Sequence, residues 1–248
     1  MKRFLTILGG AALMIACSVT ANAFPIVQVD YFTLTGTGLV DFEDITAGAP
    51  PGTNYDGILE SGGAAFAERF AGQTLSYSGD FDVLSGTPSG PLALAAGAAN
   101  QNLTVYNTLL SFPATNVLAG NGPLGYPDFD GIGEGSFAVL FDFDQSQFGF
   151  RLLSSSGGNA YVNFFKRDGS LIDSYTLSSI TDGYYGFQRD GGISEIAGIS
   201  IYNDDDAGII FDDLKHDVPG TVVPEPTTLS LLGLGLAGLG AFRKRFRK

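Results

Sequence analysis

The chain of 248 residues contains no tryptophan, one cysteine and one histidine. Zinc sites built on histidine or cysteine are therefore excluded by count. A Ser-His-Asp triad would have to use His216, which lies between Lys215 and Asp217 near the end of the central region, where we expect an exposed side chain. No phosphate-binding loop or dinucleotide fingerprint is present either.

Basic residues are scarce in the long central part of the chain. Residues 24–223 hold six basic and 25 acidic side chains, which gives a formal net charge of −19. Such a surface repels nucleic acid and anionic lipid, and it favours solubility and divalent cations. Aromatic and β-branched residues are plentiful, so the composition is that of a folded domain. We expect one domain over residues 24–218, with no nucleic-acid partner.

The amino end has the pattern of a secretory signal peptide over residues 1–23. Lys2 and Arg3 supply the positive charge, and thirteen apolar residues follow. Ala21 and Ala23 form the small-x-small site at which signal peptidase would cut. Thirteen apolar residues are too few for a comfortable membrane span, which argues against a first transmembrane helix.

An alternative places a lipid on Cys17, at the end of a lipobox-like Met-Ile-Ala-Cys sequence. Methionine is unusual at the first position of such a box, so we favour simple cleavage. The body that remains, residues 24–218, contains no cysteine and therefore no disulfide. Its stability must come from a hydrophobic core, helped by ions.

The carboxyl end has three parts in a fixed order. A linker over residues 219–226 ends in Pro224-Glu225-Pro226, which the two prolines keep extended. Residues 227–242 are 16 residues without a charge, about 24 Å as a helix. We predict a short transmembrane helix here, and a cytoplasmic tail over residues 243–248 by the positive-inside rule. The basic residues of this tail are Arg243, Lys244, Arg245, Arg247 and Lys248.

This carboxyl end resembles the PEP-CTERM sorting signal of Gram-negative bacteria. The resemblance rests on the following residues and on the basic end: Val223, Pro224, Glu225, Pro226, Thr228, Leu231, Leu232, Gly233, Gly235 and Leu236. It implies that an exosortase-type membrane protease cuts near the Pro-Glu-Pro sequence. The body would then be released or attached to extracellular polysaccharide at the cell surface. Such tails are also classed as ice-binding protein C-terminal domains, a label that does not describe the body.

Short β-rich segments separated by glycine turns predict an antiparallel β-sandwich for the body. Glycine makes up 35 of 248 residues, about twice the usual share. The predicted strands are 26–35, 39–45, 102–112, 136–144, 147–153, 193–202 and 208–215, with 147–153 expected beside 136–144. Residues 160–166 and 170–177 form a hairpin with Asp-Gly in its turn. Residues 46–57 and 113–135 are predicted loops, and 187–192 a turn.

The body also resembles jelly-roll domains of extracellular bacterial proteins, including some carbohydrate-binding modules. The matching patterns are V-x-F-F-x-R-D-G-S-L, which begins at Val162, and G-I-x-F-D-D-L, which begins at Gly208. In those modules a structural calcium ion often joins the first and last strands. The resemblance implies Glu43 with Asp212 or Asp213 as its ligands here. Other acidic clusters that suit calcium are Asp41 to Asp44, Asp128 with Asp130 and Glu134, and Asp204 to Asp206.

We expect a non-catalytic protein of the cell surface or the biofilm matrix that binds glycans. Tyr106, Tyr126, Tyr184 and Tyr185 lie in or near predicted loops and would serve as stacking surfaces. One alternative is a secreted carbohydrate-active hydrolase, which needs two carboxylates at a defined separation, although no segment singles out such a pair. The other is an adhesive or ice-interacting module that uses the threonines of residues 33–37.

Overall fold

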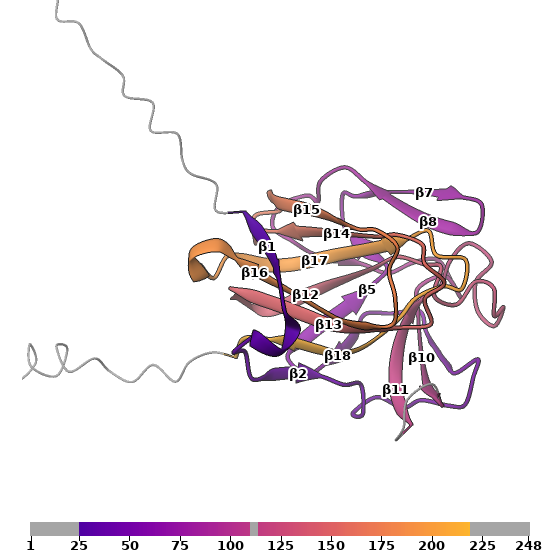
Figure 1. The fold of residues 1–248 in the computed structure, drawn as a ribbon. Coiled ribbons are helices and arrows are strands. Elements are labelled where there is room, and N and C mark those ends of the chain that lie inside the picture. Colours follow the sequence, from indigo (N-terminus) through magenta and orange to yellow (C-terminus); the bar gives the residue numbers. More distant parts are fainter. Residues whose placement is uncertain (1–24, 110–113, 219–248) are drawn as a thin grey trace, which may run out of the picture.

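The computed structural model describes residues 25–109 and 114–218 and shows two antiparallel sheets that pack face to face (Figure 1). The predicted all-β antiparallel sandwich is confirmed. Within this described part, no helix is long and apolar enough to cross a membrane. The predicted signal peptide with Ala21 and Ala23, the sorting motif, the transmembrane helix and the basic tail lie outside the described residues.

The first sheet has eight strands and forms the front of the molecule in Figure 1. Seven of them run in the order β1 (Ile26–Val29), β16 (Gly183–Arg189), β13 (Gln147–Leu153), β18 (Ile210–His216), β11 (Thr115–Gly120), β10 (Leu103–Thr108) and β3 (Thr53–Tyr55). The eighth, β2 (Gly38–Val40), also pairs with β18. Ile26 pairs with Arg189, Gln147 with Gln188, and Phe148 with His216, so the described chain begins and ends at the same end of the strands of this sheet.

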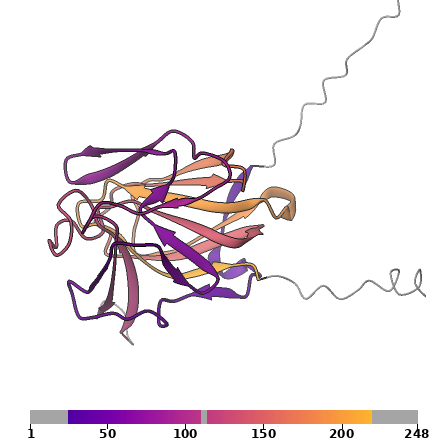
Figure 2. The ribbon, with the colours of Figure 1, turned by 180° about the vertical axis from the view of Figure 1, so that it is seen from behind.

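The second sheet has six strands and faces the viewer in Figure 2. Their order is β15 (Leu171–Leu177), β14 (Ala160–Phe165), β17 (Ile196–Asn203), β12 (Phe137–Gln145), β5 (Ala64–Ala67) and β4 (Leu59–Ser61). Two further pairs are β7 (Thr74–Ser78) with β8 (Phe81–Ser85), and β6 (Arg69–Phe70) with β9 (Leu94–Ala95). Two short 3₁₀ helices, η1 (Tyr31–Thr33) and η2 (Asp190–Gly192), follow β1 and β16.

The core is a layer of phenylalanine rings between the two sheets. Phe137 of β12 meets Phe211 of β18 with ring centroids 4.6 Å apart, and Phe164 of β14 meets Phe187 of β16 at 5.3 Å. These four rings are at most 1% exposed. Each contributes roughly 2 kcal/mol or more through removal of apolar surface from water. With no disulfide in the body, this layer joins the two sheets.

Several sequence predictions are confirmed and one pairing is wrong. The Asp-Gly hairpin forms as predicted, with Ala160 opposite Leu177 and a bulge near its turn. The predicted pairing of 136–144 with 147–153 is wrong, because β12 pairs with β5 and β17 while β13 pairs with β16 and β18. One residue, Ser146, separates the two strands, which is too short for a tight hairpin of two loop residues. The chain instead passes from one sheet to the other.

Other predicted boundaries also need correction. The predicted loops 113–135 and 46–57 contain β11 and β3, and the predicted turn 187–192 begins as part of β16. The strand predicted over 39–45 ends at Val40, because Phe42 has a left-handed φ of 55° that turns the chain. The strand predicted over 26–35 ends at Val29 and gives way to η1. This last change creates an exposed aromatic side chain.

Candidate functional site

Two glycines on neighbouring strands form a seat for η1 on the outer face of the first sheet. Gly149 of β13 and Gly186 of β16 are directly opposite each other. A methyl group added at Gly186 would lie 2.9 Å from backbone atoms of Tyr31, and one at Gly149 would lie 2.6 Å from the rim of the Tyr31 ring. The 3₁₀ turn therefore rests directly on the sheet surface.

The turn itself is fixed by Asp30, its N-terminal cap. The Asp30 carboxylate accepts a hydrogen bond from the Phe32 N–H at 2.9 Å, and its carbonyl accepts one from the Thr33 N–H at 2.9 Å. Capping of this kind is a typical role of aspartate. As a result Tyr31 points inward at 7% exposed, while Phe32 is left 70% exposed.

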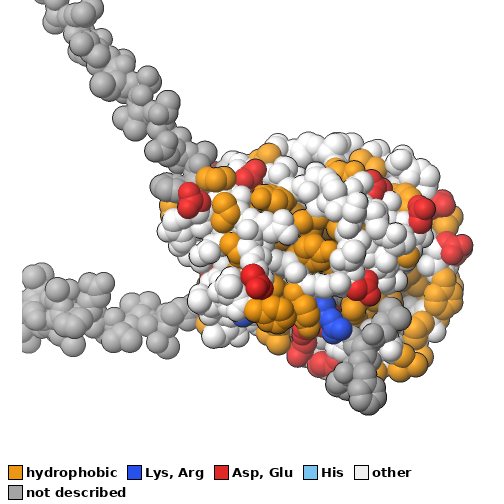
Figure 3. Space-filling view, in the orientation of Figure 1, with side chains coloured by type: hydrophobic (Ala, Val, Ile, Leu, Met, Phe, Trp, Pro, Cys, Tyr) orange, Lys and Arg blue, Asp and Glu red, His pale blue; other side chains and the backbone are white. Residues whose placement is uncertain are grey.

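Three rings meet here to form what we call the aromatic patch, made of Tyr31, Phe32 and Tyr184. The centroid of Tyr184 lies 4.9 Å from that of Tyr31 and 5.0 Å from that of Phe32, and the Tyr31–Phe32 distance is 5.4 Å. The rings are tilted or edge-on, as aromatic side chains prefer. The space-filling view in the same orientation shows hydrophobic surface beside basic side chains on this front face (Figure 3).

Two of the six basic residues of the body border the patch. The guanidinium carbon of Arg151 lies 5.7 Å from the Tyr184 ring centroid, and Nζ of Lys215 lies 5.5 Å from that of Tyr31. Both distances suit cation–π contacts. Lys215 also donates to the carbonyl of Leu34 at 2.6 Å. In a body with a net charge of −19, this is a local gathering of positive charge.

A bulge in β18 brings two carboxylates to the same place. Between Gly149 and Arg151 the pairing of β13 with β18 slips by one residue, and Asp213 takes a left-handed φ of 49°. Such strained positions in non-glycine residues are concentrated at functional sites. Asp212 is 2% exposed and faces Arg151 at 3.9 Å. The Tyr31 hydroxyl donates to the Asp213 carbonyl at 2.8 Å, which ties the patch to the bulge.

Burial governs the ionisation of these groups. Burial, followed by the charge of Asp213, raises the pKa of Asp212 to about 6, although the Arg151 guanidinium acts in the opposite direction. Burial also raises the pKa of Asp213, with Arg151 opposing it. Burial and the nearby charge of Asp213 raise the pKa of the Tyr31 hydroxyl, so that it stays a neutral donor. The patch is thus neutral aromatic surface bordered by the Arg151–Asp212 pair and by Lys215.

Such an arrangement is suited to recognition of an amphipathic ligand. Ring faces pack against an apolar face, and Tyr184, Arg151 and Asp213 supply donors and acceptors at the border. Arginine holds hydroxyl or carboxylate groups with a planar fork of donors.

The four tyrosines singled out from the sequence take different places. Tyr184 is 41% exposed and belongs to the patch, whereas its neighbour Tyr185 turns inward and stacks on Phe150 at 5.6 Å. The Tyr126 hydroxyl donates to the carbonyl of Gly52 at 3.0 Å. Tyr106 lines a mostly apolar cavity of about 360 Å³. Sequence reasoning missed Tyr31 and Phe32, although Asp30 directly before them is a recognisable cap.

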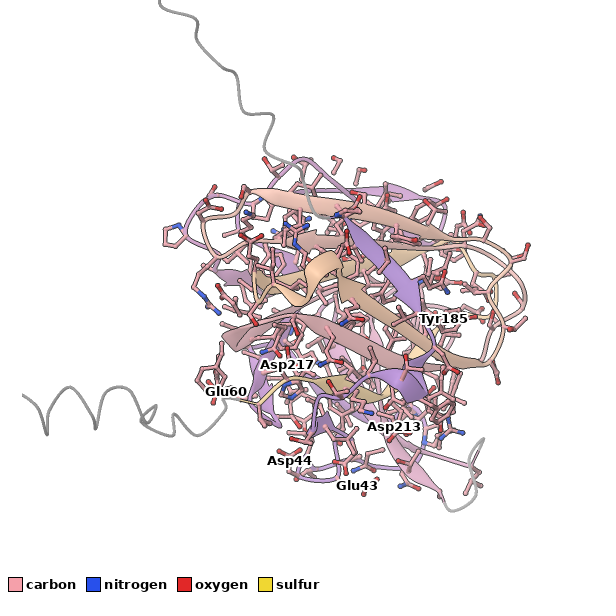
Figure 4. The ribbon with its side chains drawn as sticks, turned by 60° about the vertical axis from the view of Figure 1, so that its left-hand side comes forward. Glu43, Asp44, Glu60, Tyr185, Asp213 and Asp217 are labelled. Atoms are coloured by element: carbon pink, nitrogen blue, oxygen red, sulfur yellow. The ribbon has the colours of Figure 1, made fainter. Side chains whose placement is uncertain are left out.

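The residues proposed for calcium share one region but already have partners. Because β2 pairs with β18, Glu43 lies near the last strand, as the family resemblance implied. The Glu43 carboxylate accepts from the Thr115 hydroxyl at 3.1 Å and from the Asn116 N–H at 2.9 Å, and a hydrogen bond from Thr115 also reaches Asp212. Figure 4 labels Glu43 and Asp213. This ligand set stays a prediction, and within residues 25–109 and 114–218 no three acidic, histidine or cysteine side chains form a group that could hold a metal ion.

The single histidine is buried, so the prediction of an exposed side chain is wrong. His216 is 4% exposed, packs on Phe141 at 5.6 Å, and has its ring nitrogens 2.6 Å from the Asp217 carbonyl and 3.0 Å from the Gly62 carbonyl. It is the last residue of β18, and its ring occupies the space left by Gly38. Both nitrogens face backbone oxygens, which is the geometry of a structural residue.

Comparisons with known proteins place the carboxyl end in a defined family of signals. Residues 222–245 match the PEP-CTERM protein-sorting motif. This motif implies an exported protein that is anchored in the membrane and then cleaved by an exosortase. No curated protein matches the chain.

Part of the chain shows a likeness to solved structures. One of them contains the CBM22-1–GH10 modules of the N-terminal endo-1,4-beta-D-xylanase 10B from Clostridium thermocellum, complexed with xylohexaose. The sequence identity is 13% and the TM-score is 0.31. The match covers 51% of this chain and 26% of that one, so it spans about a quarter of the xylanase chain.

Proposed function

We propose that this exported chain, sorted through its PEP-CTERM motif, binds glycans without turning them over, at the cell surface or in the extracellular polysaccharide matrix. The aromatic patch is the observation that supports this proposal. Phe32 is the most exposed ring of the patch and has no role in the core. Phe32 and Tyr184 together expose aromatic surface in a fixed position, and exposed apolar patches of this kind mark interaction sites.

The surroundings of the patch favour a sugar chain over a purely apolar ligand. The C–H face of a pyranose ring packs on an aromatic ring, and its hydroxyls need donors and acceptors at the border of the ring. Arg151, Lys215 and Asp213 supply both kinds within the same small area. The patch combines Tyr184 of β16 with the capped η1 turn, which rests on Gly149 and Gly186, so it is held in place before a ligand arrives.

The test is retention by polysaccharide. The full chain in a zwitterionic detergent, which carries no sugar head group, is run by affinity electrophoresis through gels containing matrix polysaccharides. Phe32→Ala and Tyr184→Ala should each weaken retention roughly tenfold or more, as loss of a central aromatic contact does. The matched control is Tyr77→Ala, which removes a 55% exposed tyrosine from the β7 strand. Equal retention of all three variants would contradict the proposal.

Turnover separates binding from the hydrolase alternative. Asp44, Glu60 and Asp142 line a hollow of about 330 Å³ and are the carboxylates to vary first. We expect no release of reducing sugar from any polysaccharide that the protein retains. Release that disappears in Glu60→Gln or Asp142→Asn would assign the protein to the hydrolases instead.

The sorting step has its own test. Glu225→Ala together with Pro226→Ala should leave uncleaved protein in the inner-membrane fraction, because the extended Pro-Glu-Pro sequence is what the protease is expected to grip. A fractionated immunoblot measures this directly. Thr221→Ala, in the same linker, is the control and should be processed normally. Normal processing of the double variant would exclude recognition through Glu225 and Pro226.

A further inference from the structure

Glu134 is a carboxylate that the fold buries without a partner. Its side chain is 7% exposed, and among the residues that the structure describes its Oε2 makes no hydrogen bond. Buried charges in proteins are neutralised, paired or bound to a metal ion. A buried carboxylate that receives a full set of hydrogen bonds shows what Glu134 lacks.

Asp205 provides this comparison, because it is also buried and also lies in an acidic loop. Four consecutive residues, 155–158, surround its carboxylate. The backbone N–H groups of residues 156–158 and the hydroxyls of Ser155 and Ser156 donate to Asp205 at 2.8 to 3.0 Å. Asp205 is thus completed by protein donors, whereas no such turn among the described residues donates to Oε2 of Glu134.

The turn between β7 and β8 packs against Glu134 from one side. A methyl group at Gly122 would lie 2.6 Å from the Asp80 carbonyl oxygen and 3.3 Å from Cβ of Glu134, so these groups surround one small space. The Asp82 N–H donates to the Glu134 carbonyl at 3.1 Å. The Asp80 segment is therefore next to the buried carboxylate.

The 204–208 loop approaches from the other side through the neighbour of Glu134. The Gly133 carbonyl accepts from the Ile209 N–H at 2.9 Å and from the Asn203 side-chain amide at 2.9 Å. The backbone of Gly208 also lies against Gly133. With the 121–134 loop, which carries Glu134 itself, three loops converge at this point.

Each of these loops brings exposed aspartates, namely Asp80, Asp128, Asp130 and Asp206. Burial first, and then the charges of these four residues, raise the pKa of Glu134 to about 7. Every ion pair of residues 25–109 and 114–218 lies elsewhere, since Arg69, Arg151, Lys166, Arg167 and Arg189 bind other carboxylates. Among the described residues, Glu134 is thus surrounded by like charges from three loops, and none of these five carboxyl groups has a basic ion-pair partner.

We propose that Glu134 is the buried ligand of a divalent-cation site of the calcium type, completed by aspartates of the three loops. Calcium takes six to eight oxygen ligands in flexible geometry, including carboxylates and backbone carbonyls such as that of Asp80. The side chains do not form a ready group of three ligands in the part of the chain described here. Binding would draw the exposed aspartates towards Glu134, which loop side chains can do without disturbing the core.

The test measures calcium binding by the full chain in zwitterionic detergent after removal of metal with chelator. Isothermal titration with calcium chloride should show a site, and the thermal midpoint should rise with calcium concentration. Sodium chloride at the same ionic strength is the control for simple screening of the acidic body. Glu134→Gln, which keeps the shape of the side chain, should lose the site and the calcium-dependent rise.

Two further variants keep the test decisive if Glu134→Gln folds poorly. Asp130→Asn and Asp206→Asn change exposed residues and should each lower calcium affinity roughly tenfold. Glu43→Gln, from the ligand set suggested by family resemblance, should leave binding unchanged. No binding by the parent chain, or binding that Glu43→Gln abolishes and Glu134→Gln preserves, would overturn the proposal.

Discussion

The outer face of the first sheet and the loop edge around Glu134 are both candidate binding sites, but they are built in opposite ways. On the sheet face, Arg151 has Asp212, Lys215 has the Leu34 carbonyl, and the rings rest on a glycine seat. At the loop edge, Oε2 of the buried Glu134 has no hydrogen-bond partner in the part of the chain that the structure describes, and the neighbouring charges share its sign.

This difference indicates what each region needs. The aromatic patch is complete without a ligand and offers a preformed surface, so a ligand adds contacts without reorganising the protein. The loop edge carries negative charge that no basic side chain of the described residues compensates, so a bound cation would change the geometry of the loops and the stability of the fold. The first region should therefore be sensitive to shape, and the second to pH and divalent ions.

The largest effect should come from filling the glycine seat. Gly186→Ala places a methyl group 2.8 Å from the Val29 carbonyl and 2.9 Å from the Tyr31 backbone. The resulting overpacking should cost about 1–3 kcal/mol of unfolding free energy and abolish glycan retention. Gly57→Ala, where nothing lies within 4 Å, is the control. The calcium response should survive in both variants, and its loss in Gly186→Ala would show that the two regions are coupled.

A smaller effect should follow from removal of a partner on the sheet face. Arg151→Met leaves Asp212 buried without its cation and should lower stability by about 1–2 kcal/mol near pH 8. Because the pKa of Asp212 is raised to about 6, the carboxyl becomes neutral in acid and the loss should shrink at pH 5. Arg167→Met, which breaks a pair with Asp144 that is about 40% exposed on both sides, should cost less than 1 kcal/mol at either pH.

The smallest effect should be the pH dependence of the unfolding free energy that Glu134 contributes when calcium is removed. Its pKa is raised to about 7 in the folded chain, above the usual carboxyl value, so the folded state binds more protons than the unfolded state between about pH 4.5 and 7. Stability should therefore fall as pH rises through this window and level off above it. Urea unfolding with chelator should show a shallower decline in Glu134→Gln. An identical slope in both proteins would contradict the burial of this group as a neutral acid.

Asp82 contributes to the same decline of stability with rising pH, and calcium distinguishes its contribution from that of Glu134. Burial raises the pKa of Asp82 to about 6, although hydrogen bonds from Ser136 oppose the shift. Asp82 is 1% exposed and its Oδ2 accepts both hydrogen bonds from Ser136, so calcium should not change its part of the slope. Calcium should reduce the decline of stability with pH only by the part that Glu134→Gln also removes.

The local features of the fold were predictable from the sequence. The Asp-Gly turn after Arg167 and the alternation around it predicted the hairpin correctly, because its strands are joined by a tight turn. The strand predicted over 208–215 is confirmed as β18, within two residues at its start and one at its end. The pairing of β12 with β5 and of β13 with β18 was not predictable, because it depends on which sheet each buried strand joins.

The candidate sites depended on contacts between distant segments. Tyr184 and Tyr185 are neighbours on β16, and only the register with β13 and the seat at Gly186 decides which ring faces outward. Asp205 and Glu134 both lie in acidic loops, and the sequence around them does not show which of the two carboxylates receives hydrogen bonds. Asp205 receives its donors from residues about 50 positions earlier, which no local pattern reveals.

The most direct test of the account is to locate the glycan on the protein. Amide chemical shifts of the full chain in zwitterionic detergent are followed by NMR during titration with oligosaccharides from a retained polysaccharide. The account predicts that the largest shifts occur at Phe32, Tyr184, Arg151 and Lys215. Largest shifts around the stacked Tyr161–Tyr202 pair of the second sheet, or none at saturating sugar, would contradict it.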